Sequence, residues 1–463
     1  MATAVARPAE WVSPAQVDEL SRALGETPEL RRRRLEAYDR FQELPIEPNP
    51  LYRGYGYFSN VNLAGVDATA TGPAVALPRP PAGALRVVHD AAGTRADVAP
   101  ELAAAGVKVV TFGPTTASAA DGQLSSWETD EPADRLSALA SSLWNRGYRL
   151  EVPAHLPAPL RVQDVTILSR PHEALSIRRR VRAGAASQLL LTEEVYSTKA
   201  APAGQRFHAS ATALELGDEA KAICLTLHAP DLETVSAYQR TGSTGAASRL
   251  GWLWTGLGGF RSKVRNHTRL IGRGSFVDDL QLFYGSGDQS YDSSVNLTHV
   301  GTDTHGQSIT RGVFTDRARG MSRGLVRIEK EAAKTLSFIS EHAMLLSPGA
   351  RSDTIPILEI LCRDVKATHS TSVHPVDPEQ VFYLESRGIA GPESVRMIGE
   401  GFLAYVLERA PVPGLRDVLF PALEARWNGE ALPWTPGGGR LLPELEVRGT
   451  ETSPEWRFDT KLR

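Results

Sequence analysis

The sequence predicts a mainly β protein: a right-handed parallel β-helix core flanked by N-terminal and C-terminal helical regions. From Tyr148 to about residue 375, short β-leaning runs alternate with Gly, Asn, Asp or charged residues, and long helical patterns are missing. Residues 355–361 are almost continuously apolar, which fits strands stacked in a coil better than half-exposed hairpin strands. Asn-Gly and Asp-Gly turns are few, so an antiparallel sandwich or barrel is less favoured.

The chain before the coil divides into two regions. Residues 1–60 are expected to be mainly helical, because Ser13 and Pro14 fit a cap and first turn ahead of apolar residues at helical spacing. The basic run 31–34 is interpreted as a solvated helix face, with a partner-docking patch as the alternative. Residues 61–147 are expected to hold linkers, edge strands and one helix.

After the core at 148–375, residues 376–430 are expected to be helical again. Asp377 can cap a helix whose first position is Pro378, and Gly388 suits the left-handed position that ends it. Two further helices are expected, one starting at Pro392 and one over 415–427. Residues 431–463, rich in Pro and Gly, are expected to form an irregular tail.

Composition excludes several functional classes. The formal net charge of −3 argues against nucleic-acid binding, and no apolar run is long enough to span a membrane. Because the N-terminus lacks a signal-peptide hydrophobic region, we expect a cytoplasmic protein. The two cysteines, Cys224 and Cys362, exclude a disulfide framework and a self-contained four-cysteine metal or iron–sulfur site, and both are interpreted as small buried hydrophobes.

Few residues carry recognisable chemistry. Nucleotide-binding loops, GxSxG and HExxH motifs are absent. Asp303 and His305 lie two apart, so on a strand they would share a face; they are either metal ligands or turn residues bonded to neighbouring backbone. His369 lies where the β region gives way to helices, and such a solitary histidine is either structural or functional.

From about Gly285 to Val406 the chain resembles the SufB/SufD family of iron–sulfur cluster assembly proteins. Several family motifs occur in order. They are Gly306-Gln307-Ser308, Arg311-Gly312-Val313, Gly324-Leu325-Val326, Asp364-Val365-Lys366, Thr368-His369, Gln380-Val381-Phe382-Tyr383-Leu384 and Ser386-Arg387-Gly388-Ile389. Residues 1–130 and the tail beyond about 430 are poorly covered.

Within this family the departures favour the SufD type. The SufB type carries a cysteine where this chain has Ala350, and an acidic residue where it has Ser370. The family histidine corresponds to His369. SufD proteins commonly have a cysteine two residues earlier, where this chain has Ala367, so a thiolate role is not carried over to that position.

The resemblance implies a non-catalytic subunit rather than an enzyme. A SufD-like chain pairs with a SufB-type scaffold through its β-helix and docks the SufC ATPase through C-terminal helices. It implies that His369 lies at the SufB interface, able to ligate iron or a nascent cluster shared with SufB, and that the chain alone holds no stable cofactor. The expected SufC-docking residues are Phe382, Tyr383, Arg387, Gly388 and Ile389.

Two alternatives remain open from the sequence. One is a SufB-type cluster scaffold, against which the missing cysteine at Ala350 speaks. The other is a β-helix enzyme acting on polysaccharide, which would need clustered carboxylates along one face of the coil.

Overall fold

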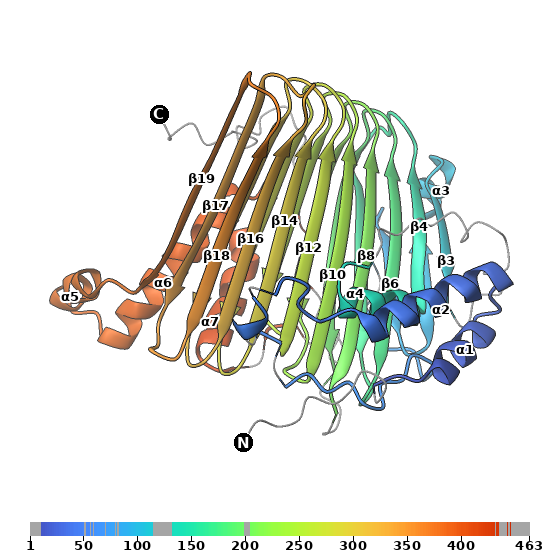
Figure 1. Cartoon of the computed structure of the whole chain (residues 1–463), viewed down its shortest axis with the longest axis horizontal. Helices are drawn as coiled ribbons and strands as arrows, with labels where there is room; N and C mark the ends of the chain where they lie inside the picture. The colour runs from blue at the N-terminus through green and yellow to red at the C-terminus, as the bar shows by residue number, and fades with distance from the viewer. Residues whose placement is uncertain are drawn as a thin grey trace.

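The computed structural model describes residues 11–50, 52–113 (except 56, 59, 70, 79, 81 and 82), 132–198, 204–430, 432–434, 442 and 445. Within these residues the chain forms a two-sheet parallel β-helix flanked by helices (Figure 1), so the predicted fold class is confirmed. From β4 onward, successive strands alternate between the two sheets, and each pairs in parallel with the strand two positions further along the chain. The predicted tail at 431–463 falls almost entirely outside the described residues.

One sheet has ten strands. In spatial order they are β19 (Val365–Pro375), β17 (Thr335–Leu345), β15 (His305–Phe314), β13 (Phe276–Gly285), β11 (Arg249–Gly256), β9 (Lys221–Ala229), β7 (Gln188–Ser197), β5 (Leu160–Leu168), β1 (Leu85–Asp90) and β2 (Gly93–Val98). β2 pairs antiparallel with β1 and closes this sheet at the N-terminal end of the coil.

The other sheet has nine strands. They are β18 (Arg351–Ile360), β16 (Arg319–Ile328), β14 (Ser290–His299), β12 (Arg261–Leu270), β10 (Thr234–Thr244), β8 (Arg206–Leu216), β6 (Ala174–Ala183), β4 (Arg146–Val152) and β3 (Lys108–Phe112). β3 pairs antiparallel with β4 and closes this sheet at the same end.

Seven α-helices and one 3₁₀ turn are described around the sheets. They are α1 (Pro14–Ala23), α2 (Pro28–Glu43), the turn Arg53–Tyr55, α3 (Pro100–Ala104), α4 (Arg135–Leu143), α5 (Pro378–Ser386), α6 (Gly391–Arg409) and α7 (Leu415–Trp427). Apolar residues of α1, α2 and α4 pack with those of β6, β8 and β10 on the nine-stranded sheet. Those of α6 and α7 pack with residues of the ten-stranded sheet.

One corner of the coil repeats a short motif in successive turns. A glycine is followed two residues later by a residue with positive φ; the glycines are Gly184, Gly217, Gly245, Gly272 and Gly301. A Cβ atom on Gly272 would collide with the backbone of Gly245 in the preceding turn, so only glycine fits there. Asp303 occupies the positive-φ position of its turn, where its N–H donates to the carbonyl of Ala333. This corner repeat sets the stacking of the turns.

The interior of the coil has a polar band between two apolar zones. Its centre is an ion network in which Arg179 donates to Asp164 at 2.9 Å and lies 3.7 Å from Glu193. Arg240 lies 3.3 Å from the same Glu193 carboxylate. All four side chains are buried, and two positive charges balance two negative ones.

Two sequence-based expectations need correction. Residues 61–147 were expected to hold edge strands; β2 and β3 do lie at sheet edges, but β1 pairs on both sides and all its residues are buried. The basic run 31–34 was interpreted as a solvated face. Arg32 and Arg33 do pair with Glu29 at the surface, but Arg34 is buried and donates to the carbonyls of Ser142 and Trp144. The helical period brings Arg34 to the inner side of α2.

Candidate functional site at the open end of the coil

The two ends of the coil differ. Antiparallel strands close the N-terminal end, whereas β18 and β19 each pair on one side only and form what we call the open end. All residues of β18 and β19 are exposed or half-buried. The exposed apolar side chains there include Ile357, Ile360, Leu361 and Val373. Bare strand edges flanked by apolar side chains are a template for pairing with another chain.

The two bare edges are not equivalent. The N–H of Arg351 at the start of β18 donates to the carbonyl of Ala318, just before β16, and the N–H of Leu361, just after β18, donates to the carbonyl of Ile328 at the end of β16. The backbone N–H and C=O groups of the even-numbered residues of β18 therefore point outward. One of these residues is Pro356, which has no N–H. The N–H of Val376, just after β19, donates to the carbonyl of Leu345 in β17. The backbone N–H and C=O groups of the odd-numbered residues of β19 therefore point away from β17. The β19 edge therefore offers an uninterrupted row of donors and acceptors from Val365 to Val373, and the proline on this edge, Pro375, is the last residue of the strand.

His369 lies in the middle of β19, opposite Ile339 of β17. Ser370 and Ser372 contact His342 on the outer face of the sheet, so His369 points to the interior side, as do Val365 and Ala367. The imidazole is exposed and makes no hydrogen bond or ion pair with the residues that the structure describes. It is therefore available to a ligand or a partner at the open end.

Glu341, one strand below, is a neighbour that sequence reasoning missed. It lies opposite Thr371, two residues beyond the position opposite His369, and its carboxyl accepts a hydrogen bond from Ser322. Its second oxygen is buried without a partner. Burial raises the pKa of Glu341 to about 7. The sequence of β17 contained a signal for the burial of Glu341. In the alternation of the strand, Glu341 shares a face with Ile339 and Ala343, which are buried apolar residues.

Glu341→Gln should change the pH dependence of stability. A carboxyl whose folded-state pKa is raised stabilises the fold fully at low pH, and this contribution is lost as pH rises from about 4.5 through about 7. The free energy of unfolding of the variant should exceed that of the wild type by on the order of 2 kcal/mol at pH 8 and by little at pH 5. Denaturant unfolding at both pH values tests this. An equal difference at both would contradict it.

Helix α5 is a second exposed feature. Figure 1 shows it projecting beyond β18 and β19, and none of its residues is buried. Phe382 and Tyr383 are 70% and 57% exposed. The Arg387 guanidinium lies 5.2 Å from the centre of the Tyr383 ring, and Gly388 ends the helix with φ 87°. Exposed aromatic and arginine side chains together are typical of a protein-binding surface.

Helix α6 fixes α5 to the coil. It packs against β13 and β15 of the ten-stranded sheet, and Arg311 of β15 lies between the rings of Phe402 and Tyr405. The ring of His374 in β19 lies edge-on to Phe402. The ring contact between His374 and Phe402 therefore joins the strand at the open end to the helical region. Ile389, between α5 and α6, is half-buried.

The remaining predicted candidates lie elsewhere. Asp303 is a corner residue that accepts a hydrogen bond from Arg273, and His305 begins β15. Among the described residues, no group of three His, Cys, Asp or Glu side chains is placed to hold a metal ion. Cys224 is buried inside the coil, and Cys362 is half-buried in the turn between β18 and β19. No helix in the described part of the chain has the length and apolar character needed to cross a membrane.

Comparison with known proteins gives a consistent result. The family model described as SUF system FeS cluster assembly, SufBD core domain, matches residues 167–402. The iron–sulfur cluster assembly protein SufD of Bacillus subtilis is 30% identical over 296 residues, which are 63% of this chain and 67% of that protein. SufD of Escherichia coli is 29% identical over 175 residues, 38% of this chain and 41% of the relative.

A SufBD family protein of Mycobacterium leprae is 30% identical over 176 residues, 36% of this chain and 45% of that protein. The matches thus span two thirds of the Bacillus protein but less than half of the other two. The family model covers the coil from the end of β5 onward and α6 as far as Phe402, so it includes the open end and α5. The chain belongs to the SufB/SufD family and, within it, is of the SufD type.

Proposed function

We propose that this chain acts in iron–sulfur cluster assembly as a non-catalytic, SufD-like subunit of a complex with a SufB-type scaffold and a SufC-type ATPase. The observation that carries the proposal is the open end, where a bare strand edge presents an exposed histidine beside a projecting helix. The relatives are named as SufD assembly proteins, which supports this role. Two unpaired cysteines suit a reducing compartment, and we place the chain in the cytoplasm.

The SufB-type partner is proposed to bind at the open end. Pairing with β19 would satisfy its outward-facing N–H and C=O groups and would cover Val373 and Leu361. His369 would then be enclosed between the two chains. A neutral imidazole is a suitable ligand for iron, and the partner would supply the thiolates, because Ala367 and Ala350 carry none. Iron or a nascent cluster is cargo of the complex, and the chain alone holds none stably.

His369→Ala should reduce cluster formation while leaving the complex intact. The imidazole is exposed and makes no hydrogen bond or ion pair with the described residues, so its removal should leave folding and partner binding unchanged. The cluster formed on the complex should fall several-fold in visible absorbance and bound iron. Ser372→Ala, three residues along the same strand, is the control, because among the described residues that hydroxyl forms its hydrogen bond with His342 on the outer face of the sheet. Full cluster yield with His369→Ala would remove the ligand role.

The SufC-type ATPase is proposed to bind α5. Phe382 and Tyr383 supply large apolar area, and Arg387 adds a charge held in place by the Tyr383 ring. Gly388 and Ile389 turn the chain from α5 into α6, which fixes the angle of this surface to the coil.

Arg387→Glu should weaken SufC binding at least tenfold. Arginine and aromatic side chains at the centre of interfaces contribute about 2 kcal/mol or more each, which corresponds to more than tenfold in affinity. Arg416→Glu on α7 is the matched control, because Arg416 is also exposed and pairs with Glu408 away from α5. Binding is measured by surface plasmon resonance with the purified ATPase. Equal affinities of both variants would refute the placement.

The proposed function as a whole is tested by co-expressing the chain with SufB and SufC homologues. A stable complex in gentle salt is expected, and the chain purified alone should be colourless and hydrolyse no ATP. Failure to form a complex with either partner would overturn the proposal. An iron–sulfur chromophore reconstituted on the chain alone would instead support the scaffold alternative.

A further inference from the structure

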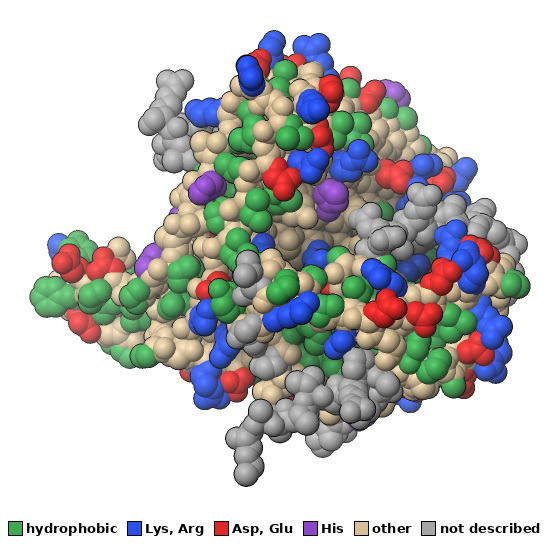
Figure 2. All heavy atoms as spheres, viewed as in Figure 1, with side chains coloured by type: hydrophobic (Ala, Val, Ile, Leu, Met, Phe, Trp, Pro, Cys, Tyr) green, Lys and Arg blue, Asp and Glu red, His purple; other side chains and the backbone are tan. Residues whose placement is uncertain are grey.

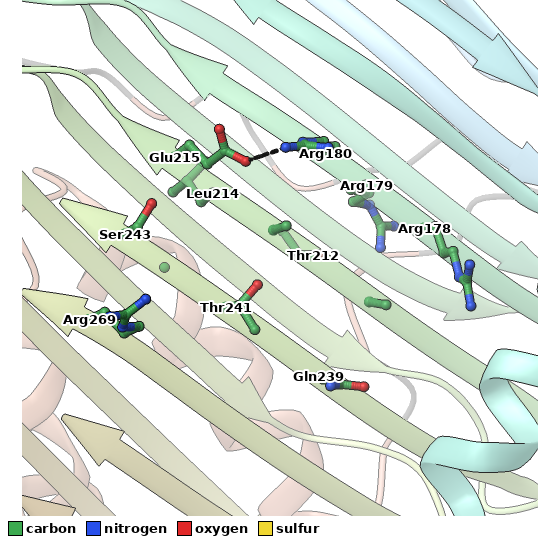
Figure 3. Close-up of a pocket in the computed structure, with 13 residues that line it drawn as sticks. Arg178, Arg179, Arg180, Thr212, Leu214, Glu215, Gln239, Thr241, Ser243 and Arg269 are labelled. Atoms are coloured by element: carbon green, nitrogen blue, oxygen red, sulfur yellow. Dashed lines mark hydrogen bonds and ion pairs between the residues drawn. The ribbon is translucent and has the colours of Figure 1, made fainter. Parts of the chain in front are cut away.

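The outer face of the nine-stranded sheet contains a cavity of about 240 Å³ next to α4. Figure 2 shows this face hollowed above the N-terminal helices, with Lys and Arg side chains inside the hollow. Figure 3 shows the cavity crossing β6, β8, β10 and β12. We call it the arginine groove, because Arg178, Arg180 and Arg269 line it. It lies on a different face from α5 and at a distance along the coil from β19.

The depth of the groove has a simple cause in the sequence. The outward-facing residues of β8 at its centre are Ala211 and Ala213, which lie between longer side chains on β6 and β10. Arg180 is opposite Ala213 on one side, and Thr241 is opposite it on the other. Short side chains in the middle strand therefore form a floor, and the neighbouring strands form walls.

The positive charge in the groove is only partly compensated. Glu215 pairs with Arg180 (Figure 3) and also with Arg182, so one carboxylate serves two guanidinium groups. Arg269 is exposed and has no ion pair with the described residues. The groove therefore holds more positive than negative charge.

Arg178 is the least compensated of these cations. Its guanidinium lies 4.9 Å from the centre of the Trp144 ring, whose other cationic neighbour is Arg34 at 4.7 Å. It has no ion pair with a carboxylate among the described residues. Burial and the nearby Arg34 charge lower the pKa of Arg178 to about 9. A bound anion would relieve this unfavourable charge.

Neutral donors complete the groove. Gln239, Thr241 and Ser243 are spaced two apart on β10, so they share the outer face. None of their side chains makes a hydrogen bond with the described residues, and Figure 3 shows all three along the groove. Arg178 and Arg269 lie three strand spacings apart, about 14 Å across the sheet, and they are also offset along the strands, because Arg265 and not Arg269 is in register with Arg178. A single small anion cannot reach both.

We propose that the arginine groove binds an elongated small molecule that carries more than one phosphate group. Guanidinium groups bind phosphate oxygens through paired N–H donors, and the hydroxyls of Thr241 and Ser243 and the amide of Gln239 supply further donors between them. The volume of the cavity, about 240 Å³, suits a small molecule, and the overall charge of −3 disfavours a nucleic acid.

Isothermal titration calorimetry of the full chain with tripolyphosphate tests the proposal, with inorganic phosphate and citrate as comparison ligands. We expect one tripolyphosphate per chain, bound at least tenfold more tightly than either comparison ligand. Arg269→Gln and Thr241→Val should each weaken binding about tenfold, the effect expected for one charge-assisted hydrogen bond. Arg178→Lys, which keeps the charge and loses the paired donors, should also weaken it.

Arg273→Gln is the matched control, because Arg273 is an exposed arginine that pairs with Asp303 at the corner of the coil. Its binding should equal that of the wild type. Absence of saturable tripolyphosphate binding would overturn the proposal, as would equal affinity for inorganic phosphate or citrate. Loss of binding in Arg273→Gln to the same extent as in Arg269→Gln would show a diffuse charge effect and would also overturn it.

Discussion

Replacing Arg179 with Met is expected to lower the free energy of unfolding by about 3–5 kcal/mol, the range for breaking a buried ion pair by removing one partner. Arg179 lies between two buried carboxylates, with Asp164 on β5 and Glu193 on β7. Its charge holds the pKa of Asp164 well below the usual range and lowers that of Glu193 against the opposing effect of burial. Without it, both carboxylates would be under-compensated inside the coil.

Met keeps most of the side-chain volume, so the loss would report on charge rather than on a cavity. Trp252 and Trp254 are buried in the coil interior, and their fluorescence reports unfolding by denaturant. Arg182→Met is the matched control on the same strand: Arg182 is exposed, pairs with Glu215, and its loss should change stability by less than about 1 kcal/mol. If Arg179→Met also lowers the free energy of unfolding by less than about 1 kcal/mol, the buried ion network contributes little to stability.

This network also marks where sequence reasoning reached its limit. Residues 178–180 are three consecutive arginines, and the two-residue period of a strand turns only the middle one inward. The partners of Arg179 lie on the facing sheet, and Arg240 reaches Glu193 from a later turn. Such pairs depend on the stacking register of the coil, which a single sequence does not contain. The sequence indicated the strands and therefore the fold, but not which charges meet inside it.

The corner repeat was missed for a related reason. The glycines at Gly184, Gly217 and Gly245 are unevenly spaced, because turns of the coil differ in length, so no fixed period is visible. At the open end, the resemblance to a family indicated His369 and the residues around Phe382, whose roles remain predictions. Strand patterning alone did not indicate the exposed edge of β19, which follows from which strand is last in its sheet. The burial of Glu341 could have been inferred from the alternation of β17, but that pattern was not used.

Thr371→Pro is expected to abolish binding of a SufB-type partner while leaving the fold intact. Thr371 is an odd-numbered residue of β19, so its N–H faces outward from the sheet and is not needed for pairing with β17. Proline removes that donor and places its ring in the path of an added strand. β18 already carries Pro356 at an outward-facing position, which shows that the coil accommodates proline on such an edge.

Co-purification of the SufB-type scaffold with Thr371→Pro and with Thr371→Val is the most direct test of the open end as the partner surface. Valine keeps the N–H and the strand conformation, so it controls for loss of the hydroxyl. The account predicts a normal complex with Thr371→Val and at least a hundredfold weaker one with Thr371→Pro, at unchanged thermal stability. Equal recovery of the scaffold with both variants would contradict pairing at β19.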